Sequence, residues 1–117
     1  MSIEGVWTGE MYGPYGWENG GVYVLREGLL LGGNNRHYSN GRYRLEGDAY
    51  EASVAVHYYG PPRAVFGEKK EEFEIQVTGT LKDGVIEATV VRPDRPEFAM
   101  QYRMTRRMDL PAEQAAE

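Results

Sequence analysis

The chain has 117 residues, 41% of them hydrophobic and 12% aromatic, and it carries a formal net charge of −5. This length supports a single hydrophobic core, and the composition excludes an intrinsically disordered chain. The absence of cysteine excludes disulfides, thiolate metal sites and a cysteine nucleophile. The acidic balance disfavours direct nucleic-acid binding, because such binders gain most of their affinity by neutralising phosphates.

The sequence shows no membrane-spanning or targeting pattern. The longest obvious apolar run, residues 29–31, is far shorter than the roughly 18 residues that span a bilayer. The first residues lack the basic region and apolar stretch of a signal peptide. We therefore expect a cytoplasmic protein with no membrane partner.

Hydrophobic residues recur with a period of two, which is typical of strands that have one buried and one solvated face. In chain order, the pattern predicts strands at about 4–12, 21–26, 29–34, 41–46, 49–58, 71–80, 85–91 and 97–107. Turn sequences separate them at 26–28, 46–48 and 82–84, and residues 92–96 form a break with two prolines. We predict an all-β, eight-stranded antiparallel up-and-down barrel over residues 1–108, followed by a flexible tail at 109–117. A two-sheet sandwich is the alternative.

Glycine and tyrosine are unusually frequent, at 15 and 9 residues. We expect the glycines where strands bend or turn, and the tyrosines with their rings inside and their hydroxyls toward water. Two segments, 13–20 and 58–67, are predicted to be long loops that carry aromatic residues. Such loops either hold function or cap the ends of the barrel.

The residues that could perform catalysis or bind a metal are few. His37 and His57 are the only histidines, they lack the close spacing of a metal site, and no serine lies in a G-x-S-x-G motif. The least weak candidate for an acid–base site places Tyr58 and Tyr59 beside His57. We expect neither an enzyme nor a metal or other cofactor.

The interior of an eight-stranded barrel is either filled by side chains or holds one small ligand. The inward-facing positions predict a candidate lining for a small apolar ligand, formed by Trp7, Val54, Val56, Phe73, Ile75, Met100, Tyr102 and Met104. The alternative is that these bulky residues fill the barrel completely.

The tripeptide Gly5-Val6-Trp7 on the first predicted strand resembles the G-x-W signature of lipocalin and calycin barrels. The resemblance implies that Trp7 closes the base of the barrel. It also implies that an arginine from the last strand, Arg106 or Arg107, packs over the indole ring as a cation–π pair.

A second resemblance, to the GrlR-like family of bacterial regulators of type III secretion genes, covers about residues 3–105. It rests on the segments Gly5-Val6-Trp7, Gly20-Gly21-Val22-Tyr23-Val24, Glu27-Gly28, Leu31-Gly32-Gly33, Tyr38, Gly41-Arg42-Tyr43, Val56-His57-Tyr58-Tyr59 and Gly79-Thr80-Leu81. The resemblance implies a lipocalin-like barrel, usually a homodimer, that binds a transcription activator through an exposed acidic loop. That loop corresponds here to Glu46 and Asp48, which could equally form an ordinary hairpin turn.

Overall fold

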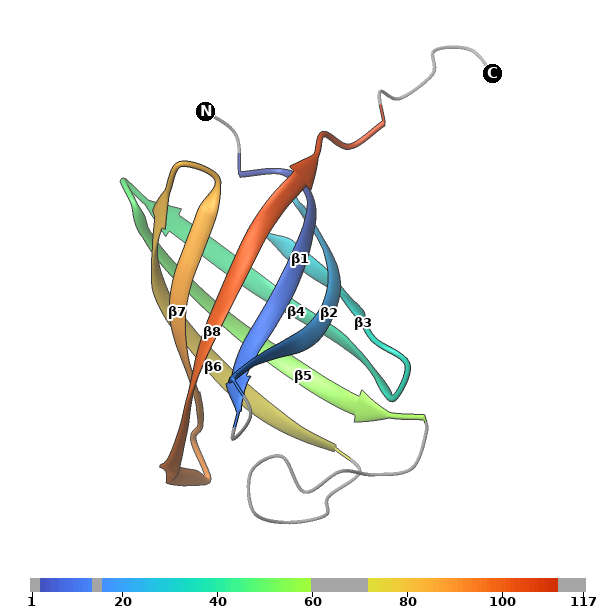
Figure 1. The fold of residues 1–117 in the computed structure, drawn as a ribbon, viewed down its shortest axis with the longest axis vertical. Helices are drawn as coiled ribbons and strands as arrows, with labels where there is room; N and C mark the ends of the chain where they lie inside the picture. The colour runs from blue at the N-terminus through green and yellow to red at the C-terminus, as the bar shows by residue number, and fades with distance from the viewer. Residues whose placement is uncertain (1–2, 14–15, 60–71, 112–117) are drawn as a thin grey trace.

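The computed structural model describes residues 3–13, 16–59 and 72–111, and every regular element in this part is a strand (Figure 1). The eight strands are β1 (Gly5–Gly13), β2 (Gly16–Arg26), β3 (Leu29–Gly33), β4 (His37–Glu46), β5 (Ala49–Tyr58), β6 (Glu72–Lys82), β7 (Val85–Arg92) and β8 (Arg95–Met108). Each strand pairs antiparallel with the next, and β8 pairs with β1 to close a barrel. The predicted up-and-down, lipocalin-like barrel is confirmed, and the sandwich alternative is wrong.

Several strand boundaries differ from the prediction, most of all the start of the second strand. The second strand begins at Gly16 rather than at residue 21, so the predicted loop at 13–20 is largely the arm of a hairpin in which Trp17 pairs with Tyr12. The fourth strand begins at His37 rather than 41, and the eighth begins at Arg95 and includes a proline. Of the other predicted loop, Tyr58 ends β5, and residues 60–67 lie outside the described residues.

The tight hairpins between strands have the backbone that their sequences predict. At the β6–β7 turn, Asp83 and Gly84 have φ angles of 52° and 75°. Two successive positive φ values characterise the type I′ turn, whose twist matches that of the flanking strands. The Asp-Gly pair, which accepts these angles readily, therefore fixes the register between β6 and β7.

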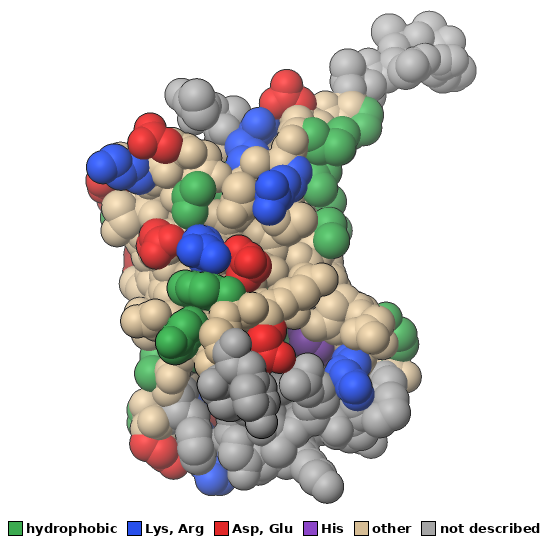
Figure 2. Space-filling view, in the orientation of Figure 1, with side chains coloured by type: hydrophobic (Ala, Val, Ile, Leu, Met, Phe, Trp, Pro, Cys, Tyr) green, Lys and Arg blue, Asp and Glu red, His purple; other side chains and the backbone are tan. Residues whose placement is uncertain are grey.

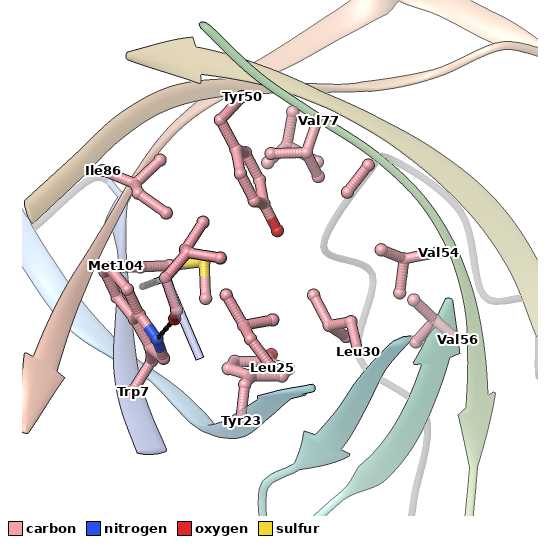
Figure 3. Packing of buried hydrophobic residues seen from close by; sticks show 13 residues of the cluster. Trp7, Tyr23, Leu25, Leu30, Tyr50, Val54, Val56, Val77, Ile86 and Met104 are labelled. Atoms are coloured by element: carbon pink, nitrogen blue, oxygen red, sulfur yellow. Dashed lines mark hydrogen bonds between the residues drawn. The ribbon is translucent and has the colours of Figure 1, made fainter. Parts of the chain in front are cut away.

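One end of the barrel is closed by a compact apolar cluster. Trp7, Leu25, Tyr50 and Ile86 are fully buried there, each with 0% of its surface exposed (Figure 3). The Trp7 indole Nε1 donates a hydrogen bond to the carbonyl oxygen of Ile3 at 2.9 Å, which ties the N-terminal segment across this end. The start of β1 and the end of β8 lie at this same end of the barrel (Figure 1).

Arg106 stabilises this closed end in a different way from the predicted stacking on Trp7. Its Nε donates to the carbonyl oxygen of Glu4 at 3.1 Å, and its Nη2 also binds Asp109 at 2.6 Å. Arg107 donates to the Thr8 hydroxyl at 2.8 Å. Among the described residues, the cation–π contacts join other arginines to other rings, so the predicted Arg–Trp7 pair is not found.

Beyond β8, residues 109–111 have no regular structure, and residues 112–117 of the predicted tail lie outside the described part of the chain. Within the described ranges, no helix is long and apolar enough to cross a membrane.

Candidate ligand-binding lumen

The half of the barrel opposite Trp7 contains an apolar cavity of about 70 Å³. The strands place inward-facing side chains around it because alternate residues of each strand point to the barrel axis. Its lining consists of Met11, Gly20, Tyr23, Leu30, His37, Ser39, Val54, Val56, Tyr58, Phe73, Ile75, Val90, Met100, Tyr102 and Met104. The barrel is therefore not completely filled by its side chains.

Seven of the eight predicted lining residues surround this cavity, and they are Val54, Val56, Phe73, Ile75, Met100, Tyr102 and Met104. Trp7 does not line the cavity, because it belongs to the cluster at the closed end. Sequence reasoning missed eight lining residues. For Tyr23 and Leu30 the same alternation was available as a signal, whereas His37 lies in a segment without alternation.

Two tyrosine hydroxyls meet inside the barrel. The Tyr102 hydroxyl donates to the Tyr23 hydroxyl at 3.2 Å, and the Tyr23 hydroxyl donates to the carbonyl oxygen of Gly20 at 3.0 Å. Burial raises the pKa of both phenols, so both are neutral across the physiological range. The expectation that the tyrosine hydroxyls point to water is wrong for this pair, because the lumen satisfies them by hydrogen bonds.

A third tyrosine hydroxyl is buried without a hydrogen bond. The side chain of Tyr50 is 0% exposed, and its hydroxyl has no hydrogen-bond partner among the described residues. Figure 3 shows this hydroxyl pointing into the middle of the barrel, toward the space enclosed by Leu30, Val54 and Met104. Those three residues also line the cavity. Burial raises the pKa of Tyr50 far above its ordinary value, and the adjacent Tyr43 adds to the shift.

Aromatic and charged side chains gather at the far end of the cavity from Trp7. The His37 and Tyr58 rings pack edge to face at 5.7 Å, and burial lowers the pKa of His37. Arg92, which is only 1% exposed, lies 4.8 Å from the ring centroid of Phe73 and binds Asp94 through Nε at 2.9 Å and Nη2 at 2.6 Å. The charge of Arg92 is therefore balanced within the protein.

The residues of the weak acid–base candidate do not converge. His57 lies on the outer wall, where its ring nitrogens contact Glu72 at 3.1 Å and Asn40 at 3.2 Å. Tyr58 instead faces the lumen, and the Tyr59 hydroxyl donates to a backbone carbonyl at 2.6 Å. Within the described residues, no cluster of three potential metal ligands occurs.

The acidic positions Glu46 and Asp48 flank Gly47 in the tight β4–β5 hairpin turn, at the same end of the barrel as Trp7. Both are exposed. Arg44 lies 3.5 Å from Glu46 and 2.6 Å from Glu51, so part of the local negative charge is offset by an adjacent cation.

The outer surface of the barrel carries charged side chains on some strands and exposed apolar side chains on others. Over β7, β8 and β1, Arg103 stands in register between Glu87 and Glu10. Figure 2 shows acidic and basic side chains close together on one face of the barrel. Over β2, β3 and β4, the exposed side chains include the apolar residues Val22, Leu29, Leu31 and Tyr38, which are between 40% and 54% exposed. We call these four residues the outer apolar face.

Comparisons with models of known protein families and with curated proteins find no match to this chain. The resemblance to the GrlR-like family therefore stays a prediction, and function is argued from the geometry of the lumen and of the outer wall.

Proposed function

We propose that the protein binds a small apolar molecule in the barrel lumen. The observation that carries this proposal is the apolar cavity of about 70 Å³ inside the barrel. Protein interiors are normally packed without such voids, and apolar cavities stay dry and accept apolar guests. A cavity of this size suits a compact molecule rather than a drug-sized one.

Three methionines make the lumen adaptable. Met11, Met100 and Met104 all line the cavity, and unbranched methionine side chains adjust to the shape of a guest. Engineered cavities of about 150 Å³ bind benzene. Small rotations of the three methionine side chains would enlarge the cavity toward the volume that such a six-membered ring needs. We therefore place the ligand at about six or seven non-hydrogen atoms.

The binding test uses toluene and protein labelled with ¹³C at the methionine methyl groups. Saturable shifts are expected for Met11, Met100 and Met104, while Met108, which is 52% exposed, serves as an internal control. Val90→Phe fills the cavity and should abolish the shifts, whereas the matched outer-wall variant Val22→Phe should preserve them. Absence of saturable shifts, or equal shifts at Met108, would refute the proposal.

A second candidate function is the binding of a protein partner, as a regulatory module of the GrlR-like kind or as a homodimer. The outer apolar face favours it, because contiguous exposed apolar side chains mark interaction surfaces. Sedimentation velocity tests the homodimer: Leu31→Lys should yield monomers, and Met108→Lys, which changes an exposed apolar residue elsewhere, should not. Weak dimers have dissociation constants on the order of 100 µM. A wild-type protein that still sediments as a monomer at about this concentration would contradict self-association.

The acidic turn offers a separate test of a basic protein partner. Replacing Glu46 and Asp48 by Gln and Asn should weaken capture of such a partner and reduce the salt dependence of binding. Glu87→Gln, which removes a negative charge from β7 rather than from the β4–β5 turn, is the control. If the turn variant and the Glu87→Gln variant bind the basic partner with equal affinity, the turn does not contact that partner.

A further inference from the structure

We infer that the lumen selects a neutral ligand bearing one hydrogen-bond-accepting oxygen, which the Tyr50 hydroxyl binds. This inference rests on the proposed lumen function and specifies the chemistry of its ligand. It is carried by a fully buried hydroxyl without a partner in the described part of the chain, pointing toward side chains that line the cavity.

Among the described residues, Tyr50 carries a buried hydroxyl that has no hydrogen-bond acceptor. The other two buried phenols form an ordered chain, in which Tyr102 donates to Tyr23 and Tyr23 donates to a backbone carbonyl. Their protons are therefore already used. Leaving a buried donor unsatisfied is costly, and native proteins normally provide a protein, water or ligand acceptor for such a group.

Tyr50 is not among the residues that line the cavity, but its hydroxyl points toward side chains that do. In Figure 3 its hydroxyl faces the layer of Leu30, Val54 and Met104, and all three also line the cavity. Met104 is the adaptable member of that layer, so its side chain can move to let a ligand oxygen reach the hydroxyl. The apolar part of the ligand would then remain among the other lining residues.

The charges around the lumen exclude an anionic ligand. Burial lowers the pKa of His37, so its imidazole is neutral at pH 7. The guanidinium of Arg92 is already held by the carboxylate of Asp94 through two hydrogen bonds. A carboxylate in the cavity would therefore lose its hydration without gaining an available counter-charge among the described residues, which is strongly unfavourable.

The test compares three six-membered-ring probes of similar shape: cyclohexanone, methylenecyclohexane and cyclohexanecarboxylate. Their dissociation constants are measured from the methionine methyl shifts of the wild-type protein and two variants. Wild-type protein should bind the ketone about tenfold more tightly than the isosteric hydrocarbon, as one added hydrogen bond implies, and should not bind the carboxylate. Tyr50→Phe should abolish the tenfold preference.

Tyr43→Phe is the matched control, because Tyr43 stacks on Tyr50 at 6.1 Å but its hydroxyl is not one of the buried groups that lack a hydrogen-bond partner. It should retain the preference for the ketone. Equal wild-type affinity for ketone and hydrocarbon, a preference that survives in Tyr50→Phe, or tighter binding of the carboxylate would each overturn the inference while leaving lumen binding intact. Failure of both neutral probes and of toluene to bind would instead overturn the proposed function itself.

Discussion

A Cβ atom at Gly9 would lie 2.6 Å from Cζ of Tyr102, so the tyrosine ring occupies the space that a side chain on β1 would fill. Gly20 on β2 is similarly covered, since its Cβ would lie 2.8 Å from the Tyr102 hydroxyl. These two glycines allow the ring to lie against the barrel wall, where its hydroxyl reaches Tyr23. Glycine here serves a close approach rather than a turn.

We expect Gly9→Ala to destabilise the protein by about 1–3 kcal/mol, the usual cost of forcing an extra methyl group into a packed core. Urea unfolding measures the loss. In a double-mutant cycle with Tyr102→Leu, the two changes should not be additive, because the shorter side chain vacates the contested space. If the two losses in the free energy of unfolding are strictly additive, the added methyl group does not clash with the Tyr102 ring.

The barrel was largely predictable from the sequence, because each strand with a buried face shows the two-residue period. The segment from Gly16 to Gly20 was not, since it is polar and glycine-rich and has no alternation of its own. Its strand conformation comes from pairing with β1, where the register shifts between Gly9 and Glu10. Long-range pairing therefore overrode the local composition.

The candidate site was predictable to the same extent as the strands that form it. Positions such as Val54 and Phe73 follow from alternation, and they line the cavity. The direction of a tyrosine hydroxyl does not follow from alternation, because it depends on the residues opposite. The unsatisfied hydroxyl of Tyr50 and the pairing of buried Arg92 with exposed Asp94 thus became evident only in three dimensions.

In the absence of ligand, Tyr50→Phe should stabilise the protein. The variant keeps the ring that packs at the closed end and removes a buried hydroxyl with no partner in the described structure. An unsatisfied buried donor costs about 1–3 kcal/mol, so a gain of about this size is expected in the free energy of unfolding. Differential scanning calorimetry of both proteins would measure it, and a lower melting temperature for the variant would indicate that the hydroxyl has an acceptor in solution.

The stability of the protein should fall as the pH drops below neutrality through the pKa of unfolded histidine, about 6.5. Burial lowers the pKa of His37 in the folded state, so over this range the unfolded chain binds a proton that the folded protein does not. By linkage, acid then favours unfolding, and the loss stops growing below the folded pKa. Above pH 7 both states are neutral and the contribution is flat.

Thermal melts between pH 5 and 8 test this dependence. His37→Gln should reduce the slope between pH 7 and 5, whereas His57→Gln, a change on the outer wall, should leave the His37 contribution in place. A His37→Gln slope equal to that of the wild type would exclude this residue as the source.

The two tryptophans should respond to substitution very differently. Trp7 is 0% exposed and donates a hydrogen bond to the carbonyl oxygen of Ile3. Trp17 is 36% exposed and lies against Arg103 on the outer wall. The guanidinium carbon of Arg103 is 4.2 Å from the centroid of the Trp17 ring. Trp7→Ala should cost about 3–5 kcal/mol, because it leaves a large cavity at the closed end. Trp17→Ala should cost about 1 kcal/mol or less, as for an exposed cation–π pair.

Chemical unfolding followed by far-UV circular dichroism measures both losses without depending on either indole. Trp17→Phe then leaves Trp7 as the single tryptophan. With excitation selective for tryptophan, its emission should be blue-shifted in the folded protein and move to longer wavelength in the same transition that circular dichroism detects. Because Trp7 lies outside the cavity lining, toluene should leave this emission nearly unchanged while it shifts the methionine methyl groups. A large change in Trp7 emission on adding toluene would place the bound molecule at the closed end instead.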